Sequence, residues 1–122
     1  MKNLIIVGLI GMLTGCKEQV SLPNVNEADW IRDEKGCTGL RMQQLTRMEE
    51  DRKLLKGLNQ DEIIAVLGRP DQNELYKRNQ KFFIYSITPH NCSEAADSLP
   101  RTYLSIRFNA TGLAKEVVIY TE

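Results

Sequence analysis

The sequence predicts an α+β fold in which two N-terminal helices pack on a three- to four-stranded antiparallel meander sheet, in the order ααβββ. Two observations lead to this prediction. Apolar residues recur at mostly helical intervals between residues 38 and 67, whereas short runs with strand-like alternation, separated by turn signals, follow between residues 73 and 120. A block of helices followed by a block of strands is typical of an α+β layer fold.

The first predicted helix covers residues 38–55. Its apolar positions form a thin stripe among charged residues, and they are Leu40, Leu45, Met48 and Leu55. The stretch "RMEEDRKLLK" mixes charges of both signs, which is typical of a solvated helix face. Glu49, Glu50 and Asp51 are consecutive, so on a helix they point in different directions rather than converging as an acid/base pair.

The second predicted helix lies within "GLNQDEIIAVLGRPD", which begins at Gly57. Asn59 followed by Glu62 matches a capping box, in which each residue bonds a backbone amide at the helix start. Gly68 favours a left-handed conformation just past the helix end, and Pro70 blocks continuation. A phosphate-binding loop is the alternative, but it needs glycines or a Gly-Lys-Ser/Thr end that this stretch lacks. We therefore expect the segment to build the fold rather than bind a ligand.

Four strand-like runs follow. Two lie on either side of "RNQ" within residues 73–87, and the third, "TYLSIRF", alternates Leu104, Ile106 and Phe108 against its other residues. The stretch "NATG" predicts a turn with Gly112 at a positive φ, and residues 113–120 form the last strand. The connection over residues 88–101 is long for a hairpin, so we expect Cys92 to pin it to the start of the first helix.

The first residues have the layout of a secretory signal. Lys2 precedes an apolar run from Leu4 to Leu13, about half the roughly 20 residues that a helix needs to span a bilayer. Small residues then lead to Cys16 in "LTGC", which resembles the bacterial lipobox. That resemblance implies that Cys16 receives a diacylglyceryl group and becomes the first mature residue once residues 1–15 are cleaved. A plain signal peptide with a coincidental cysteine is the alternative.

Residues 16–29 are polar, contain Pro23 and show no periodicity, so we expect a flexible tether. Trp30 is the first residue with the character of a core residue, which predicts a single domain over residues 30–122. By resemblance to proteobacterial lipoproteins, Lys17 in place of Asp favours sorting to the outer membrane. The expected location is the cell envelope, lipid-anchored at the outer membrane and facing the periplasm, with leaflet and orientation left open.

Cys37 and Cys92 remain after Cys16, an even number in a chain exported to an oxidising compartment, so we expect them to form a disulfide. Closing a loop of about 55 residues corresponds to roughly 4 kcal/mol of stabilisation. A zinc site made by these cysteines and His90 is the alternative, but zinc needs a fourth protein ligand or an open, supported position. His90 is the only histidine. We therefore expect no metal and no cofactor.

The charge balance and the motifs exclude several classes of function. The 16 basic and 16 acidic side chains balance, and the sequence has no basic stripe of the kind typical of nucleic-acid binding. It has no H-E-x-x-H motif, no G-x-S-x-G motif and no EF-hand calcium loop. A Cys/His nucleophile needs a free thiolate, whereas Cys92 is assigned to the disulfide. We therefore expect a protein that is not an enzyme.

Three stretches together resemble the SmpA/OmlA domain of small BamE-type bacterial lipoproteins, whose fold is similar to that of the β-lactamase-inhibitor protein. The matching positions lie at the opening and stop of the helix, in an aromatic-x-Tyr strand and in the closing hairpin: Gly57, Gly68, Pro70, Phe83, Tyr85, Phe108 and Gly112. The resemblance covers roughly residues 57–120. Residues 30–56 and the long loop around Cys92 depart from the family pattern.

The resemblance implies a sheet surface used for protein contact. We expect a non-enzymatic protein-binding scaffold of the cell envelope, with β-barrel assembly components as one partner class. The alternatives are an inhibitor or sequestering protein for an envelope hydrolase, and a module that binds envelope lipid or peptidoglycan.

The third strand carries the predicted contact residues. If its apolar positions pack on the helices, Tyr103 and Arg107 point outward, and Tyr and Arg are favoured at binding hot spots. We expect Tyr85 to join them. The alternative for Tyr103 is a half-buried strand residue with no role in binding.

Overall fold

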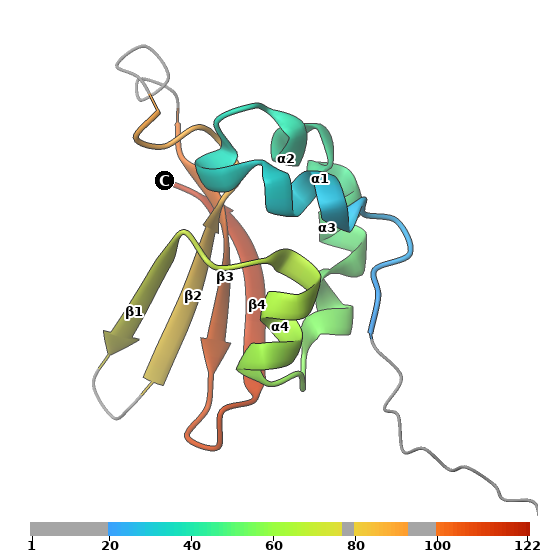
Figure 1. The fold of residues 1–122 in the computed structure, drawn as a ribbon. Helices are drawn as coiled ribbons and strands as arrows, with labels where there is room; N and C mark the ends of the chain where they lie inside the picture. The colour runs from blue at the N-terminus through green and yellow to red at the C-terminus, as the bar shows by residue number, and fades with distance from the viewer. Residues whose placement is uncertain (1–19, 77–79, 93–99) are drawn as a thin grey trace, which may run out of the picture.

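The computed structural model describes residues 20–76, 80–92 and 100–122 (Figure 1). The predicted signal peptide and the predicted lipidation site, Cys16, lie outside these residues. The described part of the chain forms two layers, with helices on one face of an antiparallel sheet (Figure 1). Helices precede strands, so the predicted α+β class is confirmed at this level.

The sheet is a four-stranded meander in the order β1-β2-β3-β4. Its strands are β1 (Gln72–Tyr76), β2 (Gln80–Ser86), β3 (Thr102–Phe108) and β4 (Ala114–Thr121). All neighbouring strands are antiparallel. The predicted turn between the last two strands is confirmed, because Gly112 has a φ of 85° and the Asn109 side chain accepts from the backbone N–H of Thr111 and of Leu113.

The helical layer has more pieces than the sequence predicts. It comprises α1 (Glu27–Arg32), η1 (Glu34–Gly36), α2 (Leu40–Gln43), α3 (Leu45–Asp51), η2 (Arg52–Leu55) and α4 (Gln60–Leu67). The predicted single helix over residues 38–55 is wrong, because it breaks at Gln44, whose ψ is 11°. The Gln44 amide accepts from Asn26 N at 2.6 Å and donates to Asn26 O at 3.2 Å. These two side-chain bonds tie the point of the break to a segment distant in the sequence.

The predicted tether over residues 16–29 is also wrong in its second half. Leu22 and Val25 are 4% and 6% exposed and belong to the main core. The N–H and the side-chain amide of Asn24 both donate to Asp51, each at 2.8 Å. Helix α1 begins at Glu27, before the predicted domain start at Trp30. The packed domain therefore includes residues from Val20 onward, because Val20 also packs against the core.

Helix α4 forms as its sequence predicts. The Asn59 side chain accepts from Glu62 N at 2.8 Å, and Glu62 accepts from Asn59 N at 2.9 Å, so the capping box is complete. Gly68 ends the helix with a φ of 80° and a ψ of −175°, which lies outside the predicted left-handed region but in one that essentially only glycine adopts. Pro70 follows, and the chain then enters β1. The stretch is a structural helix and not a ligand-binding loop.

The core lies between the helices and the covered face of the sheet. Its fully buried strand residues include Leu104, Ile106 and Phe108, as the alternation of β3 predicts. The rings of Phe83 and Phe108 meet edge-to-face with centroids 4.8 Å apart. The helical residues in this core are Trp30, Met48, Leu55, Ile63, Val66 and Leu67.

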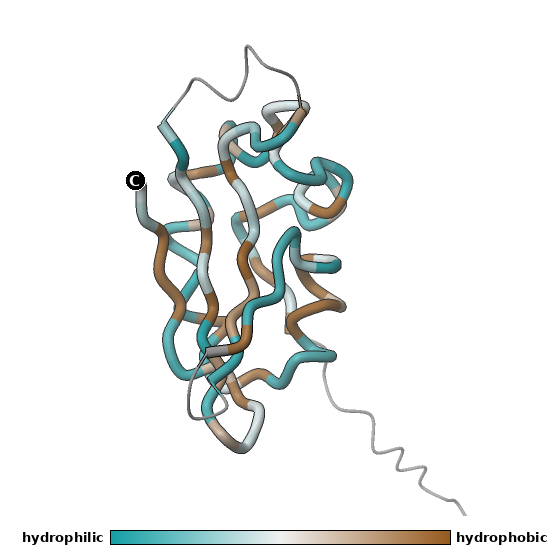
Figure 2. Tube along the Cα trace, turned by 90° about the vertical axis from the view of Figure 1, so that its left-hand side faces the viewer, coloured by the Kyte–Doolittle hydropathy of each residue, from teal (hydrophilic) through white to brown (hydrophobic). Residues whose placement is uncertain are grey.

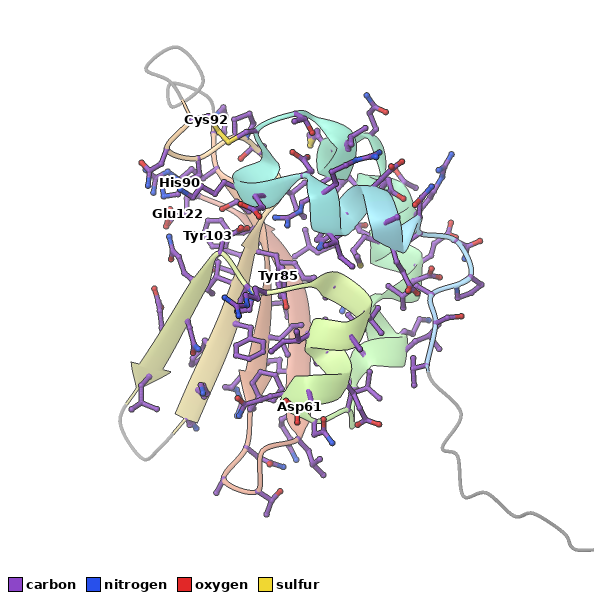
Figure 3. The ribbon with its side chains drawn as sticks, in the orientation of Figure 1. Asp61, Tyr85, His90, Cys92, Tyr103 and Glu122 are labelled. Atoms are coloured by element: carbon purple, nitrogen blue, oxygen red, sulfur yellow. A yellow bond between two sulfur atoms is a disulfide. The ribbon has the colours of Figure 1, made fainter. Side chains whose placement is uncertain are left out.

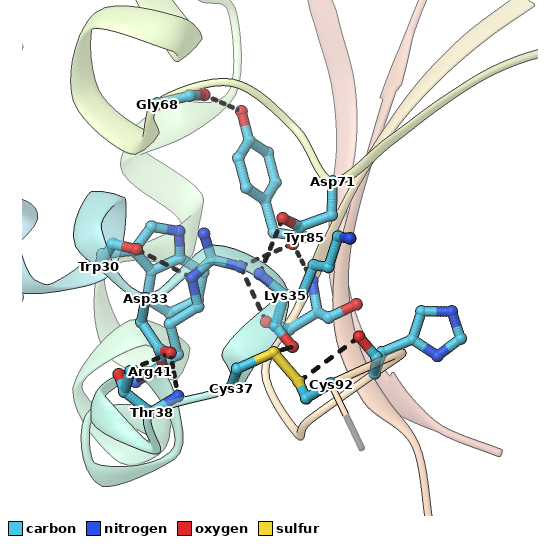
Figure 4. A network of polar contacts seen from close by, with 12 residues as sticks. Trp30, Asp33, Lys35, Cys37, Thr38, Arg41, Gly68, Asp71, Tyr85 and Cys92 are labelled. Atoms are coloured by element: carbon cyan, nitrogen blue, oxygen red, sulfur yellow. Dashed lines mark hydrogen bonds and ion pairs between the residues drawn. A yellow bond between two sulfur atoms is a disulfide. The ribbon is translucent and has the colours of Figure 1, made fainter. Parts of the chain in front are cut away.

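A buried polar network joins the helices to the sheet (Figure 4). Arg41 is 1% exposed and donates to Asp71 at 2.7 Å, to the carbonyl of Trp30 at 2.9 Å and to the carbonyl of Ser86 at 2.9 Å. Asp33 accepts from the backbone N–H of Arg41 at 2.9 Å. Every charge in this network is paired and hydrogen-bonded. The network therefore joins α1 and α2 to the start of β1 and to the end of β2.

Candidate functional site

The sheet has a second face that the described helices do not cover (Figure 2). Strand register brings the side chains of this face together in rows across the sheet. We call this surface the open face, and its residues are Gln72, Glu74, Phe82, Ile84, Ser86, Tyr103, Ser105, Arg107, Glu116, Val118 and Tyr120. It is the candidate functional site, because the core and the described helices occupy the opposite face of the sheet.

Two adjoining cavities hollow the open face. The large hollow has a volume of about 300 Å³ and is lined by Glu74, Ile84, His90, Tyr103, Tyr120 and Glu122, among others. The small hollow has a volume of about 210 Å³ and shares Glu74, Ile84 and Tyr120 with the large one. The floor contains Ser105 and Ser86, whose short side chains leave space between the larger residues around them. The face is therefore concave and lined by both aromatic and charged groups.

Tyr103 stands at the large hollow with Tyr120. Their rings meet edge-to-face with centroids 4.4 Å apart, and Tyr120 is 42% exposed. Burial, followed by hydrogen bonding with Glu122 and Tyr120, raises the pKa of the Tyr103 phenol well above its ordinary value. The phenol therefore stays protonated at neutral pH and acts as a hydrogen-bond donor to the Glu122 carboxylate.

Arg107 also lies on the open face, as predicted from the alternation of β3. Its Nε donates to the carboxylate of Glu116 on β4 at 3.3 Å. The side chains of Arg107 and Glu116 are 25% and 53% exposed, so this cross-strand ion pair is partly solvated. Tyr103 and Arg107 are thus placed together on one face, four positions apart on one strand.

Tyr85 does not lie on the open face, and the prediction that it joins the contact surface is wrong. Its side chain is fully buried on the covered face, and its hydroxyl donates to the carbonyl of Gly68 at 2.8 Å. Burial raises the pKa of the Tyr85 phenol; the charge of Arg41 opposes this shift and that of Asp71 adds to it. Tyr85 and Leu104 are paired in the strand register, so both point to the helices.

A disulfide closes one end of the open face. Cys37 and Cys92 are bonded, with Cα atoms 5.8 Å apart, which confirms the predicted pairing. It joins η1 to the segment after β2, and the N–H of His90 donates to the carbonyl of Lys35 at 3.1 Å. Gly36 makes this approach tight, since a Cβ there would lie 2.7 Å from the carbonyl oxygen of Ile87. The pairing leaves neither sulfur as a thiolate for the alternative zinc site.

His90 is held beside the large hollow by these contacts. Figure 3 shows His90, Tyr103 and Glu122 at the end of the sheet nearest to Cys92, while Asp61 lies at the opposite end. The His90 Nε2 lies 3.2 Å from the side-chain nitrogen of Asn91, and its buried Nδ1 has no hydrogen-bond partner. Across residues 20–76, 80–92 and 100–122, no group of three or more His, Cys, Asp or Glu residues is placed to hold a metal ion.

The consecutive carboxylates on the first predicted helix do not form a site. Asp51 is 2% exposed and bonds Asn24, whereas Glu49 and Glu50 are exposed. They diverge, as their spacing predicts. In the part of the chain that the structure describes, no helix is long and apolar enough to cross a membrane.

Sequence reasoning missed several residues of the hollows. The outward placement of Ile84 and Tyr120 could have been predicted from the alternation along β2 and β4, because each lies two residues from another outward position. No local signal marks Glu122 or His90, which the disulfide and the strand ends bring into place. The hollows could not be read from the sequence, because they depend on which side chains stand side by side across strands.

In comparisons with known proteins, no family model, curated protein or solved structure matches the chain. The class is defined by the described fold alone. It is an α+β protein with a four-stranded antiparallel meander, helices on one face and a hollowed, aromatic-rich open face.

Proposed function

We propose that the chain is a lipid-anchored, non-enzymatic protein-binding module of the bacterial cell envelope that docks another envelope protein on its open face. The observation that carries the proposal is the concave, helix-free sheet surface with Tyr103 and Tyr120 at a cavity of about 300 Å³. Aromatic residues beside a pocket are the groups that dominate binding energy in protein interfaces.

The chemistry of the open face favours binding over catalysis. The pKa of the Tyr103 phenol is raised, so at neutral pH the group is a hydrogen-bond donor. Arg107 is engaged by Glu116. The residues that line the hollows offer hydrogen-bond donors, acceptors and apolar surface, which suit recognition of another molecule.

The lipobox-like "LTGC" supports the anchor part of the proposal. A lipid with two or three acyl chains gives stable membrane attachment, because each buried CH₂ contributes about 0.8 kcal/mol and one chain alone holds only marginally. The globular domain then needs no contact with lipid of its own. Within this proposal, outer-membrane protein assembly is the first process to test.

Crosslinking and affinity capture of the full chain from bacterial membranes tests the function. The variant Tyr103→Ala/Tyr120→Ala removes both rings of the open face, and we expect capture of the partner to fall at least about tenfold. Met42→Ala is the matched control, because Met42 is 45% exposed and lies on α2 in the helical layer. Circular dichroism checks that both variants fold.

The identity of the captured protein separates the alternatives. A β-barrel assembly component supports the scaffold, and a stoichiometric envelope hydrolase supports an inhibitor or sequestering protein instead. If the chain is retained only by cell-wall sacculi or by lipid, the result favours a lipid- or peptidoglycan-binding module over both the scaffold and the inhibitor. Capture that is equal in wild type and in the double-alanine variant overturns the open face as the docking surface.

A further inference from the structure

We propose that the open face recognises its partner through a basic side chain, a lysine or an arginine, that enters the large hollow. This inference rests on the proposed function and names the chemistry of the segment that docks there. The occupant is an extended segment of another protein that carries this basic residue beside an apolar one.

The charges at the large hollow are the first argument. Glu74 and Glu122 both line it, and Arg101 is the one Lys or Arg side chain among its described lining residues. The ion pairs found in residues 20–76, 80–92 and 100–122 join Arg32 with Asp29, Arg41 with Asp71 and Arg107 with Glu116. Neither carboxylate of the hollow belongs to these pairs. A hollow with two carboxylates and one guanidinium attracts a cation more than an anion.

The two tyrosines are the second argument. The face of an aromatic ring attracts a cation within about 6 Å of its centroid. Tyr103 and Tyr120 stand edge-to-face at this cavity, and the ring of Tyr120 is partly exposed. The Tyr103 hydroxyl is hydrogen-bonded with Glu122 and Tyr120, and a phenol oxygen has two lone pairs with which to accept from an ammonium or guanidinium. An aromatic pair beside a carboxylate is therefore a matched environment for a basic side chain.

His90 offers a contact for the main chain of the same segment. The ring lines the large hollow, and its Nδ1 is buried without a partner. A buried polar nitrogen without a partner is destabilising. Because this nitrogen has no exposed surface, the ring must turn toward the hollow before a bound peptide group, which carries both an N–H and a C=O, can pair with it in either tautomer.

The small hollow supplies the apolar part of the recognition. It continues from the large hollow through Glu74, Ile84 and Tyr120, and it adds Phe82 and Ser105. Ile84 is only 7% exposed, so it forms a floor rather than a projection. An apolar side chain of the docked segment, a few residues from its basic one, fills this space and buries additional surface.

The first experiment uses the full chain in detergent micelles, isotope-labelled for two-dimensional NMR. The probes are acetyl-Ala-Arg-Ala-Leu-Ala-amide and the same peptide with Gln or Glu in place of Arg. We expect the Arg peptide to shift the signals of Tyr103, Tyr120 and Glu122 and to bind roughly tenfold more tightly than the Glu peptide, from one cation–π contact and one charge pair.

A pair of variants locates the effect. Glu74→Gln/Glu122→Gln keeps the shape of the hollow and removes both charges, so the preference for the Arg peptide should disappear. Glu116→Gln is the matched control on the same face, because Glu116 is already paired with Arg107 and should leave the preference intact. Thermal unfolding of both variants checks that the fold is kept.

The outcomes separate this inference from the proposed function. Equal binding of the Arg and Glu peptides overturns the basic-residue subsite, and tighter binding of the Glu peptide assigns the hollow to an acidic segment through Arg101 and His90 instead. Capture of a membrane partner that Glu74→Gln/Glu122→Gln does not weaken also overturns the inference, while the proposed docking function stands.

Discussion

The two faces of the sheet come from the same four strands but follow different rules. On the covered face, Phe83, Leu104 and Ile106 are buried, apolar and fixed by the helices above them. On the open face, the neighbouring positions are Ser105, Tyr103 and Arg107, which mix small, aromatic and charged groups. Burial in the core determines which residue types occur on the covered face. On the open face, the residue types can instead be those that a binding partner requires.

Each face also has one ion pair between an arginine and a carboxylate, in opposite environments. The side chains of Arg41 and Asp71 are 1% and 6% exposed, whereas those of Arg107 and Glu116 are 25% and 53% exposed. Removing one partner of a buried pair leaves an uncompensated charge in the core, but removing one partner of a solvated pair exposes the other to water. The same chemistry is therefore structural on one face and available for recognition on the other.

The largest effect should come from the buried pair. Arg41→Met should lower the free energy of unfolding by about 3–5 kcal/mol. It leaves the buried Asp71 carboxylate without its cationic partner and removes the hydrogen bonds to the carbonyls of Trp30 and Ser86. Arg107→Met is its counterpart on the open face and should change stability by no more than about 1 kcal/mol. Urea unfolding of both variants measures the contrast. Similar losses in the two would contradict the division between the faces.

The next effect should come from the disulfide that closes the end of the open face. Cys37→Ala/Cys92→Ala should lower the free energy of unfolding by about 2–4 kcal/mol, because the unfolded chain regains the freedom that the bridge removes. The variant also releases the segment that carries His90, so binding at the large hollow should fall as well. Unfolding with and without reductant measures the stability, and a wild type unaffected by reductant would argue against the bridge.

A matched pair of tyrosine variants gives a smaller contrast. Tyr85→Phe should lower stability by about 1–2 kcal/mol, because it leaves the carbonyl of Gly68 without its donor inside the core. Tyr103→Phe removes the same hydroxyl from the open face and should cost about 0.5 kcal/mol or less. Thermal or urea unfolding compares them. A larger loss for Tyr103→Phe would show that the open face contributes to folding.

The smallest effect is a pH dependence that the same residues produce. Tyr85 has a raised pKa in the folded state, so the folded protein holds the phenol proton more tightly than the unfolded chain does. Its contribution to stability is fully present below the ordinary tyrosine pKa of about 10 and declines as pH rises through the folded-state value. Tyr85→Phe should flatten the fall in stability above about pH 10. An unchanged alkaline profile would contradict this assignment.

The sequence predicts those parts of the fold that local rules control. The capping box of α4, the turn before β4 and the inward positions of β3 all rest on residues a few positions apart, and the structure confirms them. No local signal marks the break at Gln44, whose side chain bonds the backbone of the distant Asn26. The position of Tyr85 was predicted wrongly, because its buried contacts with Gly68 and Arg41 join residues that are distant in the sequence.

The candidate site was predicted only in part. Tyr103 and Arg107 follow from the alternation of one strand, so their placement on the open face could be read in advance. The hollows need three further strands in register and a disulfide that brings His90 beside them. Cross-strand neighbours and loop positions are non-local, and a single sequence carries no direct record of them.

The burial of Leu22 sets how far the domain can travel from a membrane. With Cys16 lipidated, as proposed, only the residues between Cys16 and the packed Val20 and Leu22 separate the lipid from the domain, a span of at most about 20 Å when extended. The chain enters the domain on the helical side, so the helices lie between that entry and the open face (Figure 1). A linker this short raises the effective concentration of the domain near partners held at the same bilayer, and it keeps the domain from reaching partners far from that bilayer.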